Sequence, residues 1–228
     1  MHKKSDMYKW HHDILQLQME TEECSKISVN DLFEVESPGV TPPVRSVIFG
    51  LAGIGKSVFT FHILDLWLRH ELLPDAIRQV FHFEMRDLSS IQSPCSLEDL
   101  FFRYQRGGIP SADAVADFFS QIESHPSSFL VIFDGLNDAS ATSVKNRTFA
   151  YNEQVEMPKL IASIINGCTL PSVQLLVTSR PGGVTNYDAY DKKAQIYGFT
   201  RETMSEYIVK FSGANREEQE AIEGYSFK

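Results

Sequence analysis

The fold of this chain is decided by the stretch Gly50-Leu51-Ala52-Gly53-Ile54-Gly55-Lys56-Ser57. The stretch fits the pattern GxxxxGK followed by Ser or Thr at every fixed position. Its glycines let backbone N–H groups turn inward around an anion, where a Cβ atom would block the approach. Lys56 is suited to neutralise β- and γ-phosphate oxygens, and the hydroxyl of Ser57 to ligate magnesium. The stretch therefore predicts a phosphate-binding loop made by all eight residues.

The sequence on either side of this loop has the order that such a loop requires. Residues 44–49 become apolar from Val47 onward and predict a buried strand. Residues 57–71 carry Phe59, Ile63, Leu66 and Trp67 at the spacing of one helix face. The helix would point the positive end of its dipole at the same anion. This context favours a phosphate site over a glycine-rich turn that precedes a helix by chance.

Strand and helix patterns alternate along the rest of the chain, which predicts a parallel sheet covered by helices on both faces. Further strands are expected over residues 80–85, 129–133, 173–177 and 195–197. Further helices are expected over residues 8–23, 96–106, 111–123, 159–166 and 200–211. Ser96 is the expected N-cap of the helix that Gly107-Gly108 ends.

Two acidic residues follow the most apolar of these strands. Asp134 comes directly after residues 129–133, where a carboxylate beside the phosphate loop would ligate magnesium. The alternative is an Asp-Gly turn that merely closes the strand. Asp138, four residues on, is a candidate to orient or deprotonate an attacking water, or else a surface aspartate of a loop.

An arginine follows the next predicted strand. Residues 175–181 read Leu-Leu-Val-Thr-Ser-Arg-Pro, and ligands of open parallel sheets bind beyond such carboxyl ends. Arg180 is therefore a candidate to reach the γ-phosphate. Pairing with surface acids is the other interpretation of the same arginine.

Composition excludes several other classes of protein. The chain has 228 residues with 21 basic and 30 acidic side chains, a net charge of −9, which disfavours nucleic acid as a partner. No apolar run is long enough to span a membrane, and the polar N-terminus does not resemble a signal peptide. Three widely spaced cysteines favour neither a disulfide framework nor a zinc site, and a reducing cytoplasm is the expected location.

Three blocks together resemble the NACHT nucleotide-binding domain of NOD-like receptors, within the STAND class of P-loop NTPases. Residues 47–57 are similar to the Walker A segment of that family, 129–138 to its Walker B segment and 175–181 to its sensor segment. Residues 197–200 resemble the strand and cap that lead into its helical subdomain. The likeness spans about residues 44–211.

The resemblance implies an α/β fold: a three-layer P-loop NTPase with a parallel sheet, followed by the start of a helical subdomain. It also implies one extra strand between the Walker A and Walker B strands. The expected division is a polar, partly helical segment with a Pro-rich linker over 1–43, the nucleotide-binding domain over 44–199, and the start of the helical subdomain over 200–228. The chain is then expected to be a fragment or a truncated product.

In function, the resemblance implies an ATP/ADP switch that uses Mg²⁺ and controls self-association, commonly in innate immunity; the expected partners are further copies of the protein or other signalling proteins. The sequence departs from the family at Asn137 and Asp138, where two acids are usual and the second is commonly Glu. Slow or absent ATP hydrolysis is therefore expected. A catalytic P-loop enzyme, such as a nucleoside or small-molecule kinase, remains the alternative.

Overall fold

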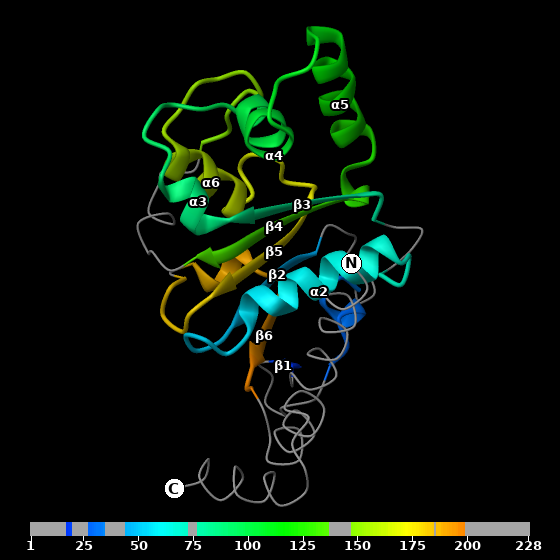
Figure 1. Ribbon diagram of the computed structural model, residues 1–228, viewed down its shortest axis with the longest axis vertical. Coiled ribbons are helices and arrows are strands. Elements are labelled where there is room, and N and C mark those ends of the chain that lie inside the picture. Colours follow the sequence, from blue (N-terminus) through cyan, green and yellow to red (C-terminus); the bar gives the residue numbers. More distant parts are fainter. Residues whose placement is uncertain are drawn as a thin grey trace, which may run out of the picture.

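The computed structural model describes residues 17–19, 27–34, 44–72, 77–136, 147–184 and 186–198. A six-stranded sheet lies at its centre, with the order β1-β6-β2-β5-β4-β3 (Figure 1). Five of the strands are parallel, and β1 joins β6 in the antiparallel direction. The strands are β1 (Leu17–Met19), β2 (Arg45–Phe49), β3 (Gln79–Glu84), β4 (Phe129–Leu136), β5 (Gln174–Ser179) and β6 (Lys192–Ile196).

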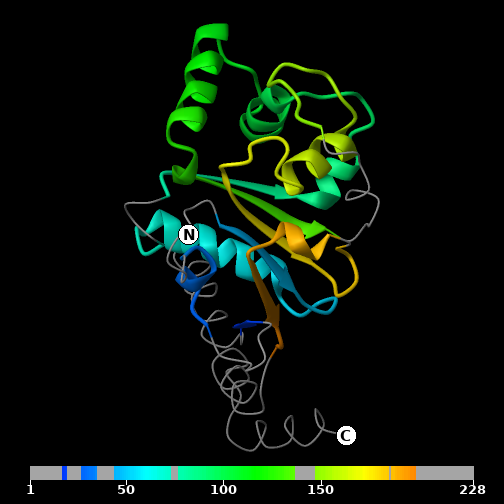
Figure 2. The same cartoon turned by 180° about the vertical axis from the view of Figure 1, so that it is seen from behind.

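Helices cover both faces of the sheet, as the views from the front and from behind show (Figures 1 and 2). The helices are α2 (Lys56–Leu68), α3 (Met85–Ser89), α4 (Tyr104–Arg106), α5 (Ala112–Ser124) and α6 (Met157–Ile165). Short 3-10 turns lie at Asn30–Leu32, Pro126–Ser128 and Tyr187–Ala189, and a π-helical turn spans Asp99–Arg103. The layers confirm the predicted three-layer α/β fold of a P-loop NTPase.

The alternation of side chains along the strands divides the core in two, because successive residues of a strand point to opposite faces. Even-numbered residues such as Ile48 and Ile132 pack against Phe59 and Ile63 of α2. Odd-numbered residues of the same strands pack against the face that carries α5 and α6. The even-numbered side chains of these strands therefore point toward α2, the helix that follows the loop.

The strand order places β5 between β2 and β4. This confirms the expected extra strand between the Walker A and Walker B strands. Strand β4 also runs further than the sequence indicated, to Leu136, with an irregular register against β5 between Phe133 and Leu136. Such a bulge is frequent beside functional sites, because it changes the direction of a side chain or backbone N–H group.

Local capping explains where two of the predicted helices begin. Ser111 accepts a hydrogen bond from the N–H of Ala114 and caps α5. The hydroxyl of Ser96 accepts from the N–H of Asp99 (3.1 Å), whose carboxylate in turn accepts from the N–H of Ser96 (3.0 Å). These reciprocal bonds form a capping box. The expected N-cap at Ser96 is thus confirmed.

One predicted helix is wrong where the structure describes it. Leu17–Met19, inside the helix expected over 8–23, forms strand β1 and pairs with residues 194–196 of β6. The free edge of β6 offers a ladder of backbone donors and acceptors, and pairing with it overrides a local helical pattern. The helix expected over 200–211 lies outside the described residues, as do the remaining residues of 8–23.

Residues 27–34 complete the face of the sheet that carries α2. Leu32 and Phe33 are buried in the same cluster as Phe59. The hydroxyl of Ser46 on β2 donates to the carbonyl of Leu32 (2.5 Å), and Lys192 on β6 donates to the carbonyl of Asp31. This segment is therefore part of the packed fold. Among the described helices, none is both long and apolar enough to span a membrane.

Candidate functional site

The loop between β2 and α2 has a backbone that only glycine adopts easily. Gly53 and Gly55 have φ angles of +75° and +108°, a region in which a Cβ atom is strained. Gly50 has no such angle, but a Cβ there would lie 2.7 Å from Cγ2 of Ile54. The spacing of the glycines is thus explained by conformation at two positions and by close packing at the third.

Lys56 begins α2 and folds back over the loop. Its Nζ atom donates hydrogen bonds to the carbonyls of Gly50 (2.8 Å) and Leu51 (2.9 Å). Burial lowers the pKa of the Lys56 ammonium, and the positive charge of Arg180 lowers it further, whereas Asp134 acts to raise it. Arg180 and Asp134, predicted from two other segments, therefore both lie within electrostatic reach of Lys56.

Asp134 lies near the carboxyl end of β4 and is only 5% exposed. Its Oδ1 atom accepts a hydrogen bond from the hydroxyl of Thr178 on β5 (2.5 Å). The same hydroxyl accepts from the N–H of Gly135 (2.8 Å). Thr178 thus links the bulge of β4 to the neighbouring strand and fixes the carboxylate. The sequence analysis did not single out Thr178, although its position directly before Ser179 and Arg180 pointed to the same site.

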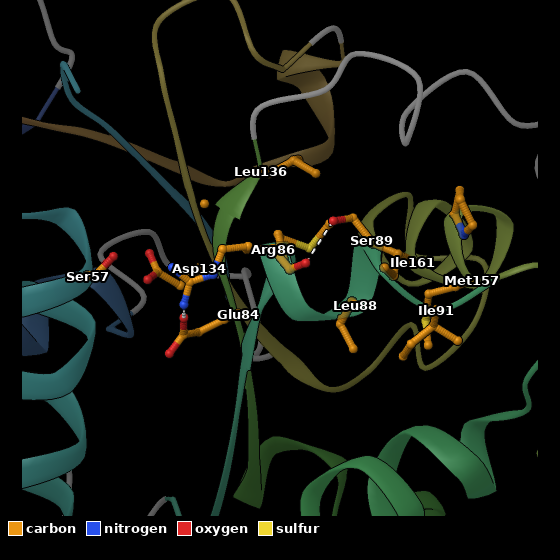
Figure 3. A pocket seen from close by; sticks show the side chains of 13 residues that line it. Ser57, Glu84, Arg86, Leu88, Ser89, Ile91, Asp134, Leu136, Met157 and Ile161 are labelled. Atoms are coloured by element: carbon orange, nitrogen blue, oxygen red, sulfur yellow. Dashed lines mark hydrogen bonds and ion pairs between the residues drawn. The ribbon is translucent and has the colours of Figure 1, made fainter. Parts of the chain in front are cut away.

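Ser57 and Asp134 line the same cavity, which has a volume of about 330 Å³. The sheet and α2 bring them together: Ser57 lies in the first turn of α2, and Asp134 is an even-numbered residue of β4, the set that faces that helix. Figure 3 shows both side chains in one close-up together with Glu84 and Arg86 from the end of β3 and the start of α3. Neither of those two was singled out from the sequence.

The chemistry of this donor pair fits magnesium. No group of three or more His, Cys, Asp or Glu side chains that could hold a metal occurs in the described part of the chain. Magnesium is commonly held by one or two protein oxygens together with phosphate oxygens and water. The hydroxyl of Ser57 and the fixed carboxylate of Asp134 could supply the protein's share of such a set.

A buried polar network supports the first turn of α2. Nε2 of His82 on β3 lies 3.0 Å from the hydroxyl of Thr60, which donates to the carbonyl of Ser57 (2.9 Å). Burial lowers the pKa of His82, while the charges of Asp134 and Glu84 act to raise it. The network connects the strand that carries Glu84 to the helical turn that carries Ser57.

Of the two remaining predicted site residues, the structure describes Arg180 but not Asp138. Arg180 follows β5 and is exposed, and its positive charge lowers the pKa of Lys56. The hydroxyl of Ser179 beside it donates to the carbonyl of Leu136, which ties the two strand ends together. Asp138 and its neighbour Asn137 lie outside the described residues.

Comparison with known proteins agrees with this geometry. Residues 45–215 match the family described as the NACHT domain. The chain is 26% identical over 196 residues to "NACHT, LRR and PYD domains-containing protein 12" of Mus musculus, covering 83% of this chain and 18% of that protein.

Two further relatives agree with that match. "NACHT, LRR and PYD domains-containing protein 3" of Mus musculus is 26% identical, with 92% of this chain and 20% of that protein covered. "Protein NLRC5" of Homo sapiens is also 26% identical, with 90% and 10% covered. The chain thus spans a fifth or less of the length of these curated relatives. Because the family match extends over well more than half of its residues, the chain belongs to the NACHT domain family.

Proposed function

We propose that this chain is the ATP/ADP-binding switch module of a NOD-like receptor-type protein. The observation that carries the proposal is the juxtaposition of the glycine loop and Lys56 with Asp134 and Arg180 at one end of the sheet. Inward-facing backbone N–H groups at the start of a helix favour a bound polyphosphate. The match to the NACHT family, whose domains are P-loop NTPases, supports the same ligand class.

Each predicted residue has a distinct role in this proposal. Residues 50–57 hold the phosphates, with Lys56 neutralising the β and γ oxygens. Ser57 and Asp134 hold Mg²⁺, which would neutralise charge on the phosphates. Arg180 contacts the γ-phosphate and so distinguishes ATP from ADP. Asp138 orients the attacking water.

Hydrolysis is slow under this proposal, because Asn137 carries no charge and the carboxylate of Asp138 is one methylene shorter than that of Glu. Slow hydrolysis suits a switch, since the bound nucleotide then persists and reports a state. We further propose that the nucleotide state controls self-association of the full-length protein in the cytoplasm, in innate immune signalling. The family membership supports this proposal, together with relatives whose names combine NACHT with other protein modules.

The first test is the substitution Lys56→Ala. We expect affinity for ATP and for ADP to fall at least about tenfold, because a charge-assisted contact contributes roughly 1.5–3 kcal/mol. Titration calorimetry with ATP, ADP and GTP, each with magnesium, measures the loss. Lys159→Ala is the matched control, since Lys159 is an exposed lysine of α6 that pairs with Glu156.

Unchanged affinity in the Lys56 variant would exclude the phosphate-loop assignment. Turnover measured on the same sample separates the switch from the kinase alternative. A switch retains ADP tightly and turns over ATP in minutes or longer. Fast turnover that depends on an added small-molecule acceptor would instead make the protein a kinase.

A further inference from the structure

A second carboxylate lies beside Asp134 at the same edge of the sheet. In the parallel register of β3 and β4, Glu84 is directly opposite Asp134, and neighbouring strands are about 4.8 Å apart. Both are even-numbered, like Val80 and Ile132, which pack in the cluster of α2. The side chain of Glu84 therefore lies on the face of the sheet that carries the phosphate loop and α2.

Glu84 also lines the cavity that contains Ser57 and Asp134, and this cavity of about 330 Å³ has room for several water molecules. In the close-up, Glu84 and Asp134 lie between Ser57 and the start of α3, and the Arg86 side chain that pairs with Glu84 is drawn between the two carboxylates (Figure 3). The cavity thus joins the proposed magnesium position to a carboxylate that the Walker B segment does not supply.

The two carboxylates have different surroundings. Asp134 is buried and held by Thr178, which suits a fixed metal ligand. Glu84 is 36% exposed, and its Oε2 atom accepts from Nη2 of Arg86 at 2.9 Å. The Arg86 side chain is itself 82% exposed, and such an exposed ion pair is weak and easily exchanged. Glu84 can therefore leave Arg86 and hold a water.

We propose that Glu84 is the catalytic residue that accepts the proton of the attacking water during ATP hydrolysis. This inference rests on the proposed function. The water oxygen forms a bond to the γ-phosphorus, and the bond from that phosphorus to the bridging oxygen breaks, with its electron pair leaving on ADP. The proton passes to the Glu84 carboxylate and then to solvent.

The experiment compares Glu84→Gln with two other variants. Gln keeps the size and the hydrogen-bonding capacity of Glu but is no base, so we expect single-turnover hydrolysis to fall about 100-fold, within the range of general-base catalysis. Glu84→Asp keeps a carboxylate and should retain part of the rate. Asp87→Asn is the matched control, because Asp87 is an exposed acid of α3 outside the cavity.

A binding readout accompanies the rate. Aluminium fluoride with Mg·ADP mimics the transferring phosphoryl group and its in-line water. We expect Glu84→Gln to bind Mg·ATP about as tightly as the wild type, because Gln keeps the size and hydrogen-bonding capacity of Glu, yet to lose the tighter binding of the fluoride complex. Thermal unfolding of each variant confirms that it is folded.

Two outcomes would overturn the inference. In one, Glu84→Gln matches the wild type in both rate and fluoride binding. In the other, the wild-type protein binds ATP but does not hydrolyse it, and it shows no tighter binding of the fluoride complex. Either result leaves the proposed switch intact, whereas a wild-type protein that binds no nucleotide removes the switch and this inference together.

Discussion

At the scale of single residues, the site depends on a threonine that holds an aspartate in place. Thr178 donates to Asp134 and accepts from the N–H of Gly135, so one hydroxyl fixes both the carboxylate and the bulge. Thr178→Val keeps the shape and removes the hydroxyl. We expect a loss of about 1–3 kcal/mol in the free energy of unfolding, as for a hydrogen bond to a charged group that is left buried.

The same variant should need more magnesium for nucleotide binding, because the Asp134 carboxylate is no longer held in one orientation. Urea unfolding and magnesium titrations at fixed ADP measure the two effects. Thr178→Ser retains the hydroxyl and is the control. If Val and Ser variants behaved alike in both measurements, Thr178 would be only a packing residue.

At the scale of secondary-structure elements, a buried carboxylate holds the start of the π-helical turn. Burial acts to raise the pKa of Asp99, but hydrogen bonds from Gln154 and Ser96 and the charge of Arg103 outweigh it, so this pKa lies below its ordinary value. A carboxyl whose pKa is lower in the folded than in the unfolded state stabilises above the unfolded pKa. That stability is lost as the pH falls toward the folded value.

We therefore expect the wild type to lose more stability than Asp99→Asn as the pH falls from about 5 to about 3. At neutral pH the variant should be less stable by about 1–2 kcal/mol, the range of a lost helix cap. Chemical unfolding across this pH range measures both effects. Asp113→Asn, in the exposed first turn of α5, is the control. If the free energy of unfolding of the wild type and of Asp99→Asn changed with pH in parallel, the prediction would be contradicted.

At the scale of the whole molecule, residues that precede the family match pack against the sheet. Leu32 is fully buried beneath the α2 face, whereas the NACHT match begins at residue 45. Leu32→Ala should lower the free energy of unfolding by about 2–5 kcal/mol, the usual cost of such a cavity. Leu68→Ala, at the 69% exposed end of α2, should change it by less than about 0.5 kcal/mol.

The measurement is urea unfolding of full-length variants with and without ADP. A Leu32 variant as stable as the wild type would show that residues 27–34 are not part of the cooperative fold. The result matters for any shortened chain that begins near residue 44, since it would lack Leu32 and Phe33.

The sequence by itself determined the elements whose signals are local. The glycine spacing of residues 50–57, the apolar run of β4 and the N-cap at Ser96 each specify backbone conformation within a few residues, and the structure confirms these local predictions. The resemblance of three blocks to one family added the strand order, which periodicity alone does not reveal. The chemical roles of the predicted site residues stay predictions.

Only the tertiary structure decided which distant residues meet. Glu84 faces Asp134 because β3 pairs with β4 in one particular register, and Thr178 reaches Asp134 because β5 lies next to β4. Leu17–Met19 is a strand because β6 has a free edge to pair with. Strand pairing is set by packing over long sequence separations, and no local pattern records which strand becomes the neighbour of which.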